Sequence, residues 1–146
     1  MPVREAAEAD LGLIMELTRE LAEFEELEHE LVATPELFRE ALFGVNRVPR
    51  VSICEDDEGN VVGHALWFPT FSTFLGTTGI WLEDLFVRPA FRGRGHATEL
   101  LEHLRASTTG RVEWEVLDWN EGATKLYEGL GAKPHRGWTK FRWLPS

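Results

Sequence analysis

The amino-acid sequence predicts an α/β domain in which a central mixed sheet carries helices on both faces. One observation is a stripe of apolar residues at steps of three and four within the first 31 residues, which is typical of an amphipathic helix. Another is a pair of apolar segments joined by the turn-like sequence DDEGN at 56–60. Beyond residue 80, strand-like and helix-like segments alternate. The chain of 146 residues is long enough for one core, so we expect a single domain over 1–146.

The first half of the chain is expected to contribute two helices and three strands. Asp10 is a suitable N-cap for a long helix, whose apolar stripe runs from Ile14 to Leu31. Thr34 and Pro35 are typical of an N-cap followed by proline in the first turn, and they begin a second helix. The expected elements are a strand at 3–6, a helix from Asp10 to Leu31, a helix at 35–42, and hairpin strands at 51–55 and 61–68.

The second half is expected to surround one strong central strand. Asn120 can cap the last helix, and Gly131 suits the position after its end, where a left-handed backbone costs glycine little. The expected elements are a loop or irregular hairpin at 69–79, a strand at 80–87, a helix that ends near Thr108, a strand at 111–117, a helix from 121 to 130 and a strand at 138–143.

Charge and composition restrict the function. A formal net charge of -10 argues against a nucleic-acid partner, because phosphate binding needs clustered Lys and Arg, but it is compatible with a cationic ligand. The chain has no run of 18 apolar residues and no basic-then-apolar start, so we expect a cytoplasmic protein with no membrane partner. The single cysteine, Cys54, follows Val51 and Ile53 in a strand pattern, and we interpret it as a buried, unreactive thiol.

The segment RGRGHA at 92–97 joins the central strand to a helix and is unusually basic for this chain. Its glycines let the backbone approach a ligand, the helix N-terminus attracts an anion, and the arginines add charge-assisted hydrogen bonds. A P-loop would need Gly-Lys-Ser/Thr here, and a dinucleotide fingerprint would need Gly or Ala where Thr98 stands. The remaining interpretations are a turn for another phosphorylated cofactor and an ordinary glycine turn with solvated arginines.

The same segment resembles the acetyl-CoA turn of the GNAT N-acetyltransferases, whose pattern is Arg/Gln-x-x-Gly-x-Gly/Ala. The resemblance covers nearly the whole chain and is strongest to the diamine acetyltransferase branch, which includes spermidine/spermine N-acetyltransferases and thialysine-acetylating relatives. It rests on ELAEFEELEHEL at 20–31, IWLEDLFVRPAFRGRGHATELL at 80–101 and VLDWNEGATKLYEGLGA at 116–132. His96 stands where an aliphatic residue is common and Ala97 where glycine is common, but both keep their backbone N–H groups.

The resemblance implies the GNAT acyl-CoA N-acyltransferase fold, a central, mostly antiparallel mixed sheet flanked by helices. It also implies acetyl-CoA as cosubstrate, a bulge that separates the central strand from the next, and a strand N–H that polarises the thioester carbonyl. For Asn120 the alternative to a cofactor contact is that it only caps the last helix. The cofactor-binding residues implied are Leu85, Phe86, Val87, Arg92, Gly93, Arg94, Gly95, His96, Ala97, Thr98, Asn120, Glu121, Gly122, Ala123 and Tyr127.

The resemblance further implies an acidic amine site and an acid for the leaving thiolate. Glu83 corresponds to the residue that contacts the amine and takes its proton, directly or through water; the alternative is a structural ion pair. Because neighbours on a strand point to opposite faces, we expect only one of Glu83 and Asp84 to line the site, and we interpret Asp84 as structural. Tyr127 matches the segment that carries the family's general acid, and the alternative is a core tyrosine. The substrate-binding residues implied are Phe24, Glu25, Glu83, Glu113 and Glu115.

We therefore expect an acetyl-CoA-dependent N-acetyltransferase for a primary amine of a diamine, a polyamine or a thialysine-like molecule. The alternatives are a protein or peptide N-acetyltransferase and a CoA-binding sensor without turnover, and the presence of Glu83 and Tyr127 favours an enzyme over a sensor. A homodimer is expected by analogy with the family. No metal is expected, because His29, His64, His103 and His135 lack metal-ligand spacing.

Overall fold

A computed structural model describes residues 2–146 of the chain. The chain divides into two compact units, one that ends at Trp114 and one that comprises Glu115–Ser146. The first unit holds a five-stranded sheet with helices, and the second holds helix α4 (Glu121–Gly129) and an extended tail. No helix among residues 2–146 is both long enough and apolar enough to cross a lipid bilayer.

The first unit is built on one sheet with the strand order β1-β2-β3-β4-β5. Neighbouring strands are antiparallel except for β4 and β5, which are parallel. The sheet is therefore mixed and mostly antiparallel, as predicted. Its strands are β1 (Val3–Glu5), β2 (Arg50–Glu55), β3 (Val61–Ser72), β4 (Thr77–Val87) and β5 (Val112–Trp114).

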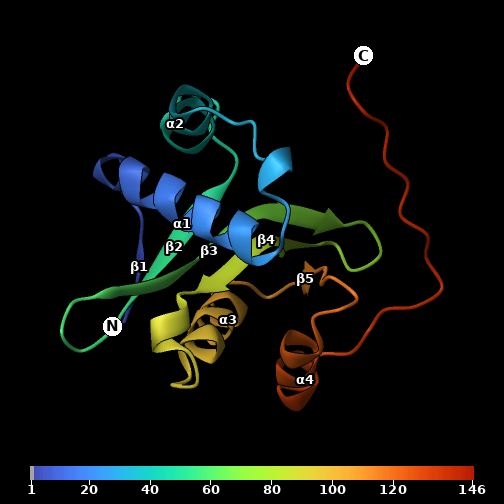
Figure 1. The fold of residues 1–146 in the computed structure, drawn as a ribbon. Helices are drawn as coiled ribbons and strands as arrows, with labels where there is room; N and C mark the ends of the chain where they lie inside the picture. The colour runs from blue at the N-terminus through green and yellow to red at the C-terminus, as the bar shows by residue number, and fades with distance from the viewer. Residues whose placement is uncertain (1) are drawn as a thin grey trace. The chain divides into compact units, whose positions relative to one another are not determined.

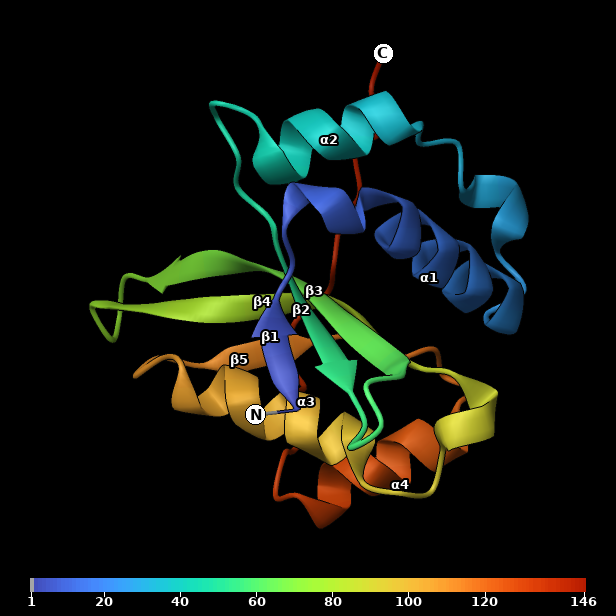
Figure 2. The same ribbon diagram turned by 90° about the vertical axis from the view of Figure 1, so that its left-hand side faces the viewer.

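Helices cover both faces of this sheet. Helices α1 (Leu11–Phe24) and α2 (Pro35–Phe43) lie on one face and α3 (His96–Ala106) lies on the other, as Figure 1 and Figure 2 show. Short 3-10 segments, η1 (Glu8–Asp10), η2 (Glu28–Glu30) and η3 (Pro89–Phe91), connect the larger elements.

The core forms where the apolar faces of the helices meet the sheet. Under α1 and α2, two adjoining clusters of buried side chains bring helix residues together with β2 and β4. Leu100 and Leu104 of α3 are fully buried as well. Each such aliphatic side chain stabilises the fold by about 1.5–3 kcal/mol relative to an exposed one. The clusters consist of Ile14, Leu42, Val51 and Ile53, and of Leu17, Leu21 and Phe86.

The predicted start of α2 is confirmed, and that of α1 is different in detail. The Thr34 hydroxyl accepts a hydrogen bond from the Leu37 N–H at 3.2 Å, with Pro35 as the first helical residue. Asp10 precedes α1, but its carboxylate accepts from the Ala7 N–H at 2.8 Å instead of from the first turn of the helix. Its other partner is Arg4, so Asp10 fastens the chain between β1 and α1.

The expectation that the first helix continues to Leu31 is wrong. Helix α1 ends at Phe24, and Glu26 adopts a left-handed backbone with φ of 59°. The N–H of Leu27 then donates to the carbonyl of Ala22 at 2.9 Å, which is the hydrogen bond that closes a Schellman motif. The apolar spacing therefore continues past the end of the helix, because no glycine or proline in the sequence marks the stop.

The loop predicted at 69–79 is instead the distal part of a long hairpin. β3 and β4 pair from Gly63–Val87 through to Ser72–Thr77. Pro69 lacks an N–H, but the last β3 residue paired with β2 is Trp67, so this part of β3 has β4 as its neighbour. A proline is tolerated where one side of a strand needs no donor.

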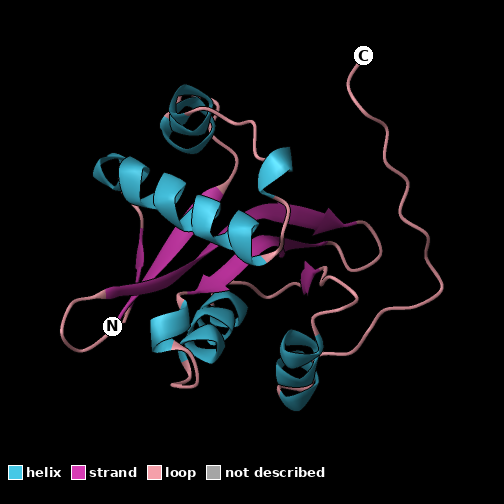
Figure 3. Ribbon diagram, in the orientation of Figure 1, coloured by secondary structure: helices cyan, strands magenta, loops and turns pink. Residues whose placement is uncertain are grey.

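The two strands predicted near the C-terminus are shorter or absent. β5 ends at Trp114 instead of continuing to residue 117, and no strand forms at 138–143. Figure 3 draws the whole segment after α4 as loop. Its aromatic side chains are exposed, Trp138 by 79% and Trp143 by 99%. A strand needs a neighbouring strand for its backbone hydrogen bonds, and this tail forms no ladder with another described segment.

Candidate active site

A β-bulge interrupts β4 at Glu83. Opposite β3, Leu66 pairs with Asp84 and Trp67 pairs with Leu82, so Glu83 is the extra residue. The parallel pairing of β4 with β5 also ends at Leu82. From Glu83 onward β4 therefore has a strand neighbour on the β3 side alone. This agrees with the bulge and the strand separation that the family resemblance implies.

The bulge places two adjacent carboxylates on the same face of the sheet. Asp84 lies opposite Leu66, which packs against the apolar cluster under α1 and α2. The indole N–H of Trp81 donates to Glu83 Oε1 at 2.9 Å, and Trp81 is paired with Phe68, two residues along β3 from Leu66. One extra residue in the strand cancels its alternation, so both acids can lie on one face, Glu83 exposed and Asp84 half-buried. The expectation that only one of them lines the site therefore no longer follows from strand geometry.

The pKa values of two carboxyl groups in this region are raised. The pKa of the half-buried Asp84 is raised to about 7, first by burial and then by the negative charges of Glu83 and Glu25. Burial also raises the pKa of Glu25. Three carboxyl groups from the end of α1 and from β4 thus share one region, and a cation there would relieve their repulsion.

The end of α1 supplies this region with Phe24 and Glu25. Glu25 is the C-cap residue, directly before the left-handed Glu26. A non-glycine residue in this conformation carries some backbone strain, and such strain is common at functional sites. The predicted substrate residues Phe24, Glu25 and Glu83 are thus brought to the same face of the unit, with Asp84 added.

Arg92 connects the glycine turn to the same region. Its guanidinium carbon lies 4.4 Å from the centroid of the Phe24 ring and 5.6 Å from that of Phe86. Its Nε donates to the carbonyl of Val87 at 2.8 Å, and burial lowers its pKa. Although Arg92 is exposed, these contacts hold the turn against β4 and the end of α1.

The glycine turn has the backbone that an anion site requires. Gly93 and Gly95 have φ of 77° and 87°, values that side chains other than glycine rarely allow. Gly95 is the N-cap of α3, and Glu99 is the first residue to donate a helical hydrogen bond, to the carbonyl of Gly95. Helical geometry leaves the N–H groups of residues 96–98 without an acceptor inside α3, and they carry the positive end of the helix dipole.

The side chain of His96 points toward the sheet. Its Nδ1 lies 3.1 Å from Glu99 Oε1 and 3.9 Å from the sulfur of Cys54 in β2. Cys54 is buried, as predicted, and its pKa is raised to about 11 by burial and by the charges of Glu99, Glu55 and Asp56. The His96 side chain is therefore engaged by Glu99 and Cys54, and the cofactor contact predicted for His96 falls to its backbone N–H.

The two acidic residues predicted on strand five fall into different elements of the structure. Glu113 is exposed in β5. Glu115 follows the end of the strand, and its carboxylate forms an ion pair with Lys140 within the second unit. β5 ends between the two residues, so they do not belong to one strand, and their contact with the substrate stays a prediction.

The second unit contains the remaining predicted residues. Asn120 Oδ1 accepts from the Ala123 N–H at 3.2 Å, which confirms the predicted cap, and Glu121 and Gly122 complete the first turn of α4. Gly131 has the predicted left-handed conformation, with φ of 93°. Tyr127 is half-buried, so it is not a fully buried core residue.

Comparison with known proteins identifies the fold. Residues 14–132 match the model of the acetyltransferase (GNAT) family. The chain belongs to the GNAT acetyltransferase family. Mouse thialysine N-epsilon-acetyltransferase is 37% identical over 154 residues, which cover 96% of this GNAT chain and 90% of the mouse protein. L-ornithine N5-acetyltransferase of Arabidopsis thaliana is 38% identical over 82 residues, which cover 53% of this chain and 36% of that protein.

Solved structures give the same GNAT fold. An aminoglycoside acetyltransferase from an uncultured soil metagenomic sample has a TM-score of 0.79 at 16% identity, with 99% of this chain and 95% of the other covered. A Bacillus halodurans protein has a TM-score of 0.78 at 20% identity, with 99% and 100% covered. The predicted family, fold and enzyme class are confirmed: the chain is an N-acetyltransferase, and GNAT enzymes take their acetyl group from acetyl-CoA.

Sequence reasoning missed two residues of the acidic region. Asp84, interpreted from the sequence as structural, belongs to this region in the structure, and an acid beside Glu83 in an apolar strand was the available signal. Trp81, which hydrogen-bonds Glu83, carried no signal because it fits an apolar strand equally well.

Proposed function

We propose that this acetyltransferase acts on a primary amine of a small cationic molecule, such as a diamine, a polyamine or a thialysine-like amino acid. The observation that carries the proposal is the group of three carboxyl groups, Glu25, Glu83 and Asp84, at the bulge of β4. Their mutual repulsion is reduced when a positively charged amine lies among them. The names of the thialysine and ornithine relatives support an acceptor of this chemical class.

Different carboxyl groups bind the amine and remove its proton. An alkylamine has a pKa of about 10.4 and arrives protonated, so the site must remove a proton before nitrogen can attack. Glu83, held by the Trp81 indole, binds the ammonium group. Asp84, with a pKa raised to about 7, is suited to accept the proton near neutral pH, directly or through water.

The cosubstrate is proposed to lie along β4 and the glycine turn. The turn from Arg92 to Thr98 presents the N–H groups and the exposed Arg94 to the pyrophosphate, while the part of β4 from Leu85 to Val87 offers backbone groups to the pantetheine arm. An N–H on this edge would stabilise the oxyanion as the C–N bond forms and the C–S bond breaks. The first turn of α4, 120–123, remains a predicted cofactor contact.

Tyr127 remains the predicted general acid. A phenol with a pKa of about 10 is protonated at neutral pH and can donate its proton to the leaving CoA thiolate. The support is the similarity of its segment, NEGATKLY, to the family's acid-bearing segment.

Release of free CoA, followed with a thiol reagent, tests the function. The amine panel contains a diamine, a polyamine, thialysine, ornithine and a lysine-containing peptide. We expect turnover with at least one small amine and a kcat/KM at least tenfold lower for the peptide. Turnover of the peptide alone would favour the protein acetyltransferase, and acetyl-CoA binding without any turnover would favour the sensor.

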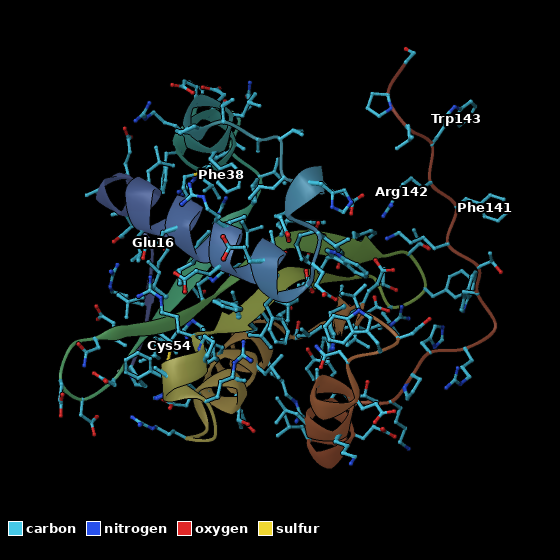
Figure 4. All side chains as sticks on the ribbon, viewed as in Figure 1. Glu16, Phe38, Cys54, Phe141, Arg142 and Trp143 are labelled. Carbon is cyan, nitrogen blue, oxygen red and sulfur yellow. The ribbon has the colours of Figure 1, made fainter. Side chains whose placement is uncertain are left out.

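A homodimer is proposed through the C-terminal tail. Figure 4 shows Phe141 and Trp143 projecting from one side of the tail and Arg142 from the other, the alternation of a strand. Phe141 is 90% exposed, and several exposed aromatics in one segment are typical of an interaction surface, which supports a second copy as the partner. Light scattering should give a dimer for the full chain and a monomer after removal of residues 138–146; a monomeric full chain at micromolar concentration would contradict this.

The cytoplasmic location stays a prediction from the sequence.

A further inference from the structure

Three potential metal ligands converge at the start of α3. Cys54 comes from β2, and His96 and Glu99 come from the first turn of the helix. The sulfur of Cys54 and Oε1 of Glu99 approach the same ring nitrogen, Nδ1 of His96, at 3.9 and 3.1 Å. A hydrogen-bonded relay through a histidine would use both ring nitrogens. Donor atoms gathered about one point are instead the arrangement of a chelating site.

The separations fit a tetrahedral zinc ion. Zn–S bonds of 2.3 Å and Zn–N bonds of about 2.05 Å at a tetrahedral angle put sulfur and nitrogen about 3.6 Å apart, and nitrogen and oxygen about 3.4 Å apart. The distances in this protein differ from these values by 0.3 Å each. All three donor atoms lie within 4.8 Å of one another, so one ion can reach all three.

The surroundings of the cluster suit a bound cation that remains accessible from solvent. Cys54 is fully buried and the His96 side chain is 11% exposed, whereas the Glu99 side chain is 37% exposed. The carboxylate side of the cluster is therefore the side that solvent reaches. Glu55 and Asp56, at the end of β2, add negative charge close to the thiol. In Figure 4 Cys54 lies beside the segment that leads into α3.

We propose that Cys54 Sγ, His96 Nδ1 and Glu99 form a Zn²⁺ site, with water as the fourth ligand. Coordination replaces the thiol proton, which passes to solvent, by a Zn–S bond. Thiolate, imidazole and carboxylate together select zinc over magnesium, which prefers a shell of oxygen ligands. The site lies outside the amine region and ties β2 to the turn proposed to hold acetyl-CoA.

Competition with a chromophoric zinc chelator tests the site on the reduced, tag-free full chain. We expect one Zn²⁺ per chain, no binding of Mg²⁺ at the same concentration, and a thermal midpoint that rises with Zn²⁺. Co²⁺ should bind in its place and give the thiolate-to-metal charge-transfer absorption that identifies Cys54 as a ligand.

Matched variants separate the cluster from other surface groups. Glu99→Gln, on the half-exposed side chain, and Cys54→Ser should each weaken Zn²⁺ binding at least tenfold. Glu102→Gln and His103→Gln, on the same helix, should keep the affinity of the natural chain within a factor of two. Absence of stoichiometric Zn²⁺ binding, a Co²⁺ complex without the thiolate band, or a folded Glu99→Gln variant with unchanged affinity would overturn the proposal.

Discussion

The two ligand regions beside β4 are organised in opposite ways. The glycine turn presents backbone N–H groups, and its shape follows from Gly93 and Gly95, whose positive φ values are a local property of the chain. The acidic region gathers side chains from a strand bulge and from a helix end that are almost 60 residues apart in the sequence. A site made of backbone can be read from a short motif, whereas a site made of converging side chains depends on how distant segments end and bend.

Neither the acidic region nor the glycine turn supplies the proton that the leaving CoA thiolate needs. Tyr127 is the predicted donor of that proton. Tyr127→Phe keeps the ring and loses the hydroxyl. If Tyr127 protonates the thiolate, kcat should fall about a hundredfold or more at saturating substrates, with little change in thermal stability. A kcat within a factor of two of the natural enzyme would remove Tyr127 from the mechanism.

A substitution of Asp84 tests whether the acidic region takes part in catalysis or only in the stability of the fold. Its pKa of about 7 lies above the ordinary value of an aspartate, so the folded state favours the protonated form. This contribution to stability is complete below about pH 4 and is lost as the pH rises through about 7, where a buried charge appears. Asp84→Asn should therefore lower kcat/KM by about ten- to a hundredfold at pH 8 and yet raise the free energy of unfolding by about 1 kcal/mol or more. Loss of stability with unchanged kinetics would identify Asp84 as a structural acid.

His64 lies on the same face of the sheet as Asp84, but its folded state becomes less stable as the pH falls and not as it rises. It is fully buried beside Phe86, and neither of its ring nitrogens has a hydrogen-bond partner among residues 2–146. Burial and the charge of Arg88 lower its pKa to about 4. Because the unfolded chain takes up a proton at about pH 6.5 and the folded chain does not, stability falls as the pH drops from about 6.5 toward 4.

Urea unfolding at pH 7 and pH 5 measures this effect. The chain should lose about 2 kcal/mol from His64 between these values. A His64→Leu variant should lose that much less over the same interval, since leucine fills a similar volume and cannot titrate. Equal losses in both proteins would show that folding does not lower the pKa of His64.

The glycine turn can be tested without touching the carboxyl groups. Gly95→Val should weaken acetyl-CoA binding at least tenfold, because a β-branched residue cannot easily adopt a φ of 87°. Gly76→Val is the matched control, since Gly76 has a φ of 68° in the turn of the β3–β4 hairpin. Calorimetry that gives both folded variants the same affinity as the natural chain would reject the cofactor assignment.

The elements predicted well are those that short-range rules determine. Thr34 and Pro35 begin α2, Asn120 caps α4 and Gly131 follows its end, because capping is a matter of a few neighbouring residues. The glycine motif also predicted the GNAT fold, because in this family the motif joins the central strand to the helix that follows it.

The elements predicted poorly depend on contacts or strain that the local sequence does not display. Helix α1 stops at a Glu26 that takes a conformation usually reserved for glycine, so the apolar spacing beyond it was misleading. The bulge at Glu83 appears only from the register against β3, and it changes the face on which Asp84 lies relative to Glu83. The segment 138–143 has the alternation of a strand, but without a neighbouring strand it stays extended loop.

The central claim is that the amine and the cosubstrate are bound by separate groups along β4. Calorimetric titration of a Glu83→Gln variant with acetyl-CoA, and separately with a diamine, tests it most directly. Loss of one negative charge from the acidic region should weaken diamine binding about tenfold, which corresponds to about 1.4 kcal/mol. The affinity for acetyl-CoA should stay within a factor of two. Weakened acetyl-CoA binding together with unchanged diamine binding would contradict the account.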